Sequence, residues 1–94
     1  MRRILCAAIW YDDKNNYKGQ PLNIQSGYVV AGLRHNNCIA TNQILSGRPT
    51  KQTDVQGFLT TTNVFTTREE AGKIAFEAGQ IKSLTACLIS EDLY

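Results

Sequence analysis

The chain has 94 residues, of which 43% are hydrophobic, and this fits one compact domain spanning residues 1–94 with no room for a second core. Ten basic residues against eight acidic ones give a net charge of +2, which does not favour binding to long nucleic acids or to a membrane surface. A domain this small buries a limited share of its surface, so we expect self-association to add stability.

The cysteines Cys6, Cys38 and Cys87 are odd in number and show no Cys-x-x-Cys spacing. Cys6 and Cys87 lie in apolar runs, which predicts buried free thiols and therefore a reducing compartment. The apolar run at residues 4–11 is too short to span a membrane and lacks a signal-peptide cleavage pattern. We therefore expect a cytosolic protein.

The first half of the chain predicts two strands joined by a loop. The continuous apolar run at residues 4–11 is typical of a strand buried on both faces or nearly so. Residues 12–25 are polar and contain Gly19 and Pro21, which predicts a loop, and a loop of this length could be functional. Residues 28–33 are β-branched and aromatic and predict a second strand, which could pair antiparallel with the first.

A short helix is expected next, although Thr41 and Asn42 are poor helix formers. Either Asn36 or Asn37 could cap its N-terminus, and the helix should end before Gly47. Its apolar residues are Ile39, Ala40, Ile44 and Leu45.

The second half predicts a strand at residues 57–61, a turn at Thr62-Asn63, a brief strand at 64–65 and a well-marked helix. Thr67 is a good N-cap, and Glu70 completes a capping box. Gly79 occupies the position of a left-handed C-cap. The helix carries apolar residues at helical spacing, Ala71, Ile74, Ala75 and Ala78, and Phe76 is expected to pack inward.

The tail at residues 86–89 predicts a last strand or a docking segment. Together these elements predict an α+β fold, in which a small antiparallel sheet carries about two helices.

Two arginines are candidates for binding an anion. Arg68 lies in the first turn of the second predicted helix, where a cation opposes the helix dipole and where phosphate is favoured. Arg34 follows a predicted strand and could grip a phosphate, while Asn36 could read a base edge or a ribose hydroxyl. The alternative is a polar turn that merely caps the next helix. Phe58 could stack on a ligand ring, with Gly57 allowing close approach, or could belong to the core.

The sequence does not favour catalysis. His35 is the single histidine, and its spacing from Cys38 does not complete a zinc site. General acid–base chemistry at His35 remains open, but a contact or structural role is favoured. Glu69 and Glu70 have structural explanations as a helix ion pair and a cap. The chain contains no nucleophile elbow, P-loop or dinucleotide fingerprint.

Four segments, RRILCAAIWY, GYVVAGLRHNNC, GFLTTTNVFTTREEAGKIAFEAGQI and LISEDLY, together resemble the Thoeris anti-defense sponge family of small phage and prophage proteins. The resemblance implies a non-enzymatic binder, without a cofactor or metal, that self-associates as a homodimer or hexamer in the cytoplasm of the infected bacterium. Its ligand would be a cyclic nucleotide second messenger, either a glycocyclic ADP-ribose isomer or a cyclic oligonucleotide.

By motif, the resemblance assigns ligand binding to Arg34, His35, Phe58 and Arg68, and less strongly to Asn63, while Asn36 stays a candidate on its position and chemistry alone. The chain departs from the family at Val64 and Asn36, where arginine and a second histidine are usual, so the exact ligand stays open. Two other functions are left as alternatives: an enzyme that degrades the signal, and a phage protein that inhibits a host protein by direct binding.

Overall fold

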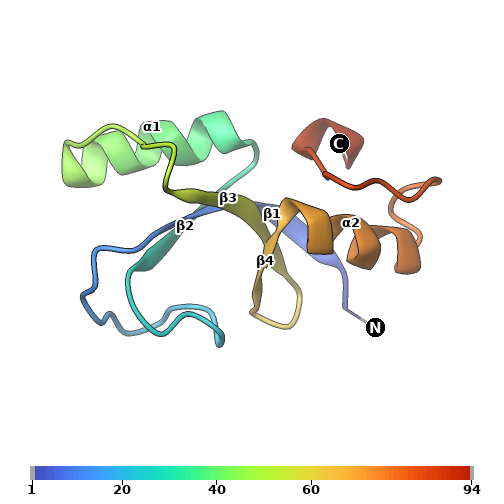
Figure 1. Ribbon diagram of the computed structural model, residues 1–94, viewed down its shortest axis with the longest axis horizontal. Coiled ribbons are helices and arrows are strands. Elements are labelled where there is room, and N and C mark those ends of the chain that lie inside the picture. The colour runs from blue at the N-terminus through green and yellow to red at the C-terminus, as the bar shows by residue number, and fades with distance from the viewer. Residues whose placement is uncertain (1, 94) are drawn as a thin grey trace.

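The computed structural model describes residues 2–93 and confirms the predicted α+β fold (Figure 1). The elements in chain order are β1 (Ile4–Tyr11), β2 (Tyr28–Gly32), α1 (His35–Ser46), β3 (Val55–Thr60), β4 (Phe65–Thr67), α2 (Arg68–Glu77) and a short 3-10 turn, η1 (Ser90–Asp92). The strands form one antiparallel sheet in the order β2-β1-β3-β4. Within residues 2–93, every helix is too short or too polar to cross a membrane.

Both helices cover the same face of the sheet. Ala7 pairs with Phe58 across β1 and β3, and Ile9 pairs with Val30 across β1 and β2. All four side chains belong to one buried cluster that also contains residues of α1 and α2. The central strand β1 is buried on both faces near its middle, since Ala7, Ala8 and Ile9 are each 0% exposed, and this confirms the prediction for that strand.

The start of α1 differs from the prediction. Its N-cap residue is Arg34, which has extended backbone angles, and neither Asn36 nor Asn37 holds that position. Asn37 instead occupies the third helical position, where its Oδ1 accepts a hydrogen bond from the Arg34 backbone N–H at 3.0 Å. The asparagine still satisfies a backbone donor at the helix start, but it does so from inside the helix.

The buried face of α1 also differs from the prediction, because His35, Cys38 and Asn42 face the sheet. Ile44 and Leu45, expected on the inner face, are 84% and 71% exposed. Burial of Asn42 is tolerated because the Tyr28 hydroxyl donates a hydrogen bond to its Oδ1 at 2.7 Å. The hydrogen bond between Tyr28 and Asn42 therefore accompanies an orientation of α1 that differs from the one its aliphatic residues favour.

The termini of α2 form as predicted. The Thr67 hydroxyl accepts a hydrogen bond from the Glu70 backbone N–H at 3.4 Å. Gly79 is left-handed with φ of 74°, and the N–H groups of Gly79 and Gln80 bond to the carbonyls of Phe76 and Ala75, which is a Schellman motif. Phe76 does not pack inward as expected; its side chain is 44% exposed, because the inward face is occupied by its neighbours in the sequence.

The C-terminal segment docks on α2 without forming a strand. Leu88 is fully buried, and its backbone N–H donates to the Arg68 carbonyl at 3.1 Å. Since Leu88 faces inward, the preceding Cys87 is exposed, which corrects the prediction of a buried thiol there. Cys6 is half-buried and Cys38 is buried, and all three thiols are free.

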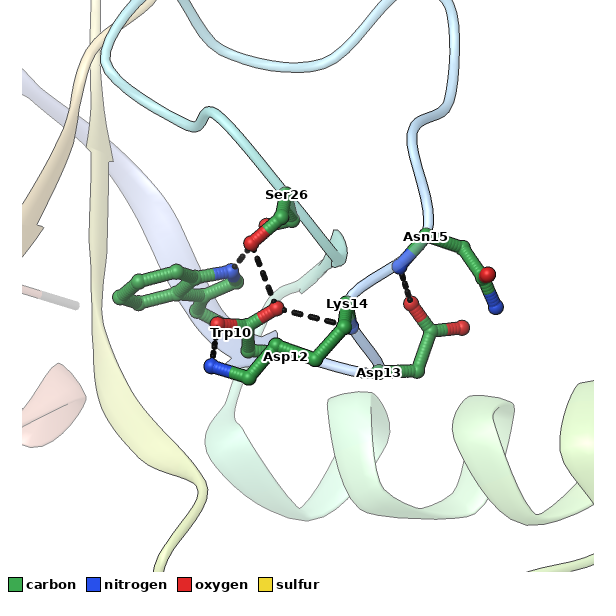
Figure 2. Close-up of polar contacts among 6 residues, drawn as sticks. All are labelled: Trp10, Asp12, Asp13, Lys14, Asn15 and Ser26. Atoms are coloured by element: carbon green, nitrogen blue, oxygen red, sulfur yellow. Dashed lines mark hydrogen bonds and ion pairs between the residues drawn. The ribbon is translucent and has the colours of Figure 1, made fainter.

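The connection from β1 to β2 is ordered by its own polar side chains (Figure 2). The Asp12 carboxylate accepts hydrogen bonds from the Lys14 backbone N–H at 3.0 Å and from the Ser26 hydroxyl at 2.7 Å. The Trp10 indole N–H donates to the Ser26 carbonyl at 2.9 Å, which fastens the end of the connection to β1. These contacts are local, so this part of the connection has a structural explanation.

Further along, the same connection reaches the β3–β4 hairpin. The Asn23 side chain donates to the Phe65 carbonyl at 2.7 Å and accepts from the Phe65 N–H at 2.9 Å, as a neighbouring strand would. The Leu22 N–H donates to the carbonyl of Asn63, which lies in the hairpin turn with φ of 61°. The connection thus covers the free edge of β4.

Candidate functional site

A cavity of about 430 Å³ lies where the starts of both helices meet the C-terminal turn. Figure 1 shows the N-terminal ends of α1 and α2 directed toward each other above the middle of the sheet, with η1 above α2. The lining residues come from four separate parts of the chain: Arg34, His35, Asn36, Ile39, Gln56, Arg68, Ile89 and Glu91. The fold therefore brings together four of the residues expected to bind a ligand, namely Arg34, His35, Asn36 and Arg68.

Arg68 carries a charge that the fold does not neutralise. Its Nη2 donates to Gln56 Oε1 at 2.7 Å and lies 3.5 Å from His35 Nδ1. Its Nε is buried and has no hydrogen-bond partner, and within residues 2–93 no carboxylate forms an ion pair with this guanidinium. An unpaired buried donor costs about 1–3 kcal/mol, more when the group is charged, so a hydrogen-bond acceptor brought to this atom would be favourable.

His35 is neutral in this arrangement. It is 8% exposed, and its Nε2 donates to the Gly57 carbonyl at 2.8 Å, which leaves Nδ1 as the acceptor facing Arg68. Burial lowers the pKa of His35 and the Arg68 charge lowers it further, against the opposing effects of the Gly57 carbonyl and Glu91. The imidazole thus contributes no positive charge of its own at neutral pH.

Gly57 has a different role from the one expected. A Cβ on this residue would lie 2.0 Å from the Thr66 carbonyl oxygen, so the glycine allows β4 to approach β3 rather than admitting a ligand. The close pairing fixes the Gly57 carbonyl that holds His35.

Arg34 and Glu91 form the exposed side of the cavity. Arg34 Nη1 lies 3.9 Å from Glu91 Oε1, and the two side chains are 32% and 67% exposed. An ion pair this long and this exposed contributes little to stability. Asn36 is exposed beside them, at the first turn of α1.

Two of the expected ligand residues lie elsewhere. Phe58 is 0% exposed and packs edge-on against the His35 ring at 5.2 Å, so it has no free surface in this structure on which a ligand could stack. Asn63 is in the turn that follows β3, whereas Gln56 of the cavity lies near the beginning of that strand. Phe58 contacts the cavity residue His35 through its ring, and Asn63 is not among the residues that line the cavity.

Four residues of the cavity were not expected from the sequence to bind a ligand: Ile39, Gln56, Ile89 and Glu91. Gln56 has no local signal, because its proximity to Arg68 depends on the pairing of β3 with β4 and on where α2 begins. Glu91 belongs to the acidic pair in the tail, and only the docking of Leu88 brings that segment to the cavity.

The arrangement places two cations, Arg34 and Arg68, around a neutral imidazole. The free lone pair of His35 faces a guanidinium, and this cation opposes the proton gain that a general base needs. Within residues 2–93, no cluster of three histidine, cysteine or acidic residues is placed to hold a metal ion.

Residues 3–94 match a protein-family model described as phage T4 y16D protein. Comparison with curated proteins and with solved structures gave no match.

Proposed function

Since the chain belongs to the phage T4 y16D protein family and is therefore a small phage protein, we propose that it binds a cyclic nucleotide immune signal of the host and holds it uncleaved. The ligand is a glycocyclic ADP-ribose isomer or a cyclic oligonucleotide, and the protein acts as an anti-defense sponge in the cytoplasm of the infected bacterium. It requires no cofactor.

The observation that carries this proposal is the guanidinium of Arg68, which has no ion pair within residues 2–93 and lies in one cavity with a second arginine, Arg34. Planar guanidinium groups bind phosphate oxygens through paired charge-assisted hydrogen bonds, and two of them match the two charges of a diphosphate. The volume of about 430 Å³ lies within the range of small-molecule sites. Asn36 and Glu91 offer an amide and a carboxylate for the base edge and the sugar hydroxyls.

Sequestration is favoured over degradation by the state of His35. Both of its ring nitrogens already face protein groups, the Gly57 carbonyl and the Arg68 guanidinium. Tight binding without turnover requires only contacts that are organised before the ligand arrives. The hydrogen bond that Arg68 donates to Gln56 provides such organisation.

Self-association is part of the proposal. Ile44 and Leu45 lie exposed on the outer side of α1, and we propose that a second copy of the chain covers them.

A retention experiment tests the proposed function. The purified protein is mixed with cyclic ADP-ribose isomers and with cyclic di- and trinucleotides, free ligand is removed, the protein is denatured, and the released compounds are analysed. We expect one compound to be recovered intact. Recovery of an altered compound indicates an enzyme, and no retention from the whole panel overturns the proposal.

Arg68→Ala should weaken retention about 10- to 100-fold, the effect of losing charge-assisted hydrogen bonds worth roughly 1.5–3 kcal/mol. The helix should remain folded, because the substitution removes an unfavourable cation from its first turn. Lys73→Ala is the matched control: it removes the same charge from an exposed position of α2 that does not line the cavity. Unchanged retention by Arg68→Ala removes this arginine from the site.

A further inference from the structure

We propose that the phosphate group enters the cavity together with a proton, which His35 accepts at Nδ1 and donates to the ligand as a hydrogen bond. This inference rests on the proposed function and adds His35 to the ligand contacts as a proton-carrying donor.

The geometry of the ring leaves one nitrogen for this role. Nε2 already donates to the Gly57 carbonyl at 2.8 Å, so the proton can be gained only at Nδ1. Nδ1 faces Arg68 Nη2 at 3.5 Å, at the long limit for a hydrogen bond. Little is therefore lost when the guanidinium turns toward a phosphate and Nδ1 becomes a donor.

The charges around His35 set the direction of the effect. Arg68 of α2 and Glu91 of η1 act on the ring with opposite signs, and Arg34 precedes it at the start of α1. From β3 the ring meets the Gly57 carbonyl and the uncharged ring of Phe58. His35 is also the first residue of α1, where the helix dipole disfavours another positive charge.

In the free protein these surroundings keep the imidazole neutral, since burial and Arg68 lower the pKa of His35. A bound phosphate neutralises Arg68 and places negative charge near Nδ1, and both changes raise the pKa of His35. The complex therefore holds the proton more tightly than the free protein does. By linkage, affinity rises as the pH falls through the pKa of His35 in the complex, and it levels off below the pKa of the free protein.

Nuclear magnetic resonance can follow this proton directly, because His35 is the single histidine of the chain. The imidazole is titrated in the free protein and in the presence of cyclic ADP-ribose or a cyclic dinucleotide. The diphosphate charges of the first and the phosphodiester charges of the second stay constant where histidine titrates. We expect a higher pKa of His35 in the complex. Affinity for the same probe should increase on acidification by at most about tenfold per pH unit, because a single site takes up one proton.

His35→Gln is the diagnostic variant. Its amide can still donate toward the Gly57 carbonyl and accept from Arg68, but it cannot take up a proton. The pH dependence of binding should disappear in this variant.

The outcomes separate the two proposals. Binding with an unchanged or lowered pKa of His35 overturns the proton uptake and leaves the proposed function standing. If neither probe perturbs any resonance of the wild-type protein, the anion site itself is refuted. The measurement on the wild-type chain decides the question even if His35→Gln fails to fold.

Discussion

Replacing Phe58 with leucine distinguishes a core role for this ring from a ligand-stacking role. Phe58 is 0% exposed, and leucine removes three buried carbons at about 0.8 kcal/mol each. The edge-on contact with His35 at 5.2 Å is lost as well, and such aromatic contacts contribute about 0.5–1.5 kcal/mol. We expect a destabilisation of about 3 kcal/mol, which for a chain of 94 residues corresponds to a fall in Tm of roughly 12–24 °C.

Thermal unfolding followed by circular dichroism measures this change, and ligand retention is then assayed at a temperature where the variant is folded. Phe76→Leu is the matched control, because Phe76 is 44% exposed and its replacement should change stability by no more than about 0.5 kcal/mol. If Phe58→Leu kept the wild-type Tm but lost retention, the ring would be a stacking surface, and the assignment of Phe58 to the core would be refuted.

Two further predictions concern the thiols and the outer side of α1. Cys87 is exposed and should react at once with a thiol reagent. Burial raises the pKa of Cys38 to about 11, so Cys38 should react only after the protein is unfolded in guanidinium chloride. Simultaneous reaction of both thiols in the native protein would contradict this prediction. Ile44→Lys should lower the molar mass in solution from a multiple of 10.5 kDa toward that of a single chain, as measured by light scattering, and a wild-type chain that is already monomeric would refute self-association.

The sequence predicted correctly those features that depend on contacts between residues close in the chain. The cap at Thr67 and the left-handed Gly79 depend on hydrogen bonds within a few residues, so the pattern alone locates α2. The apolar run of β1 similarly identifies a central strand. Arg68 could be singled out because a cation at the start of a helix is locally unfavourable.

The face that α1 turns toward the sheet could not be predicted from local sequence patterns. The helix offers an aliphatic face with Ile44 and Leu45 and a polar one with Asn42, and local pattern favours burial of the first. The opposite arrangement depends on Tyr28, which lies on β2 and supplies the hydrogen bond that Asn42 needs in order to be buried.

By itself, the sequence determined the α+β elements, the ends of α2 and the two arginines, because these follow from contacts between residues close in the chain. Only the tertiary structure decided that Arg34 and Arg68 share one cavity, that Gln56 and Glu91 join them, and that the ring expected to face a ligand is buried. The physical reason is strand pairing and the docking of Leu88, which join distant segments through contacts that no local pattern specifies.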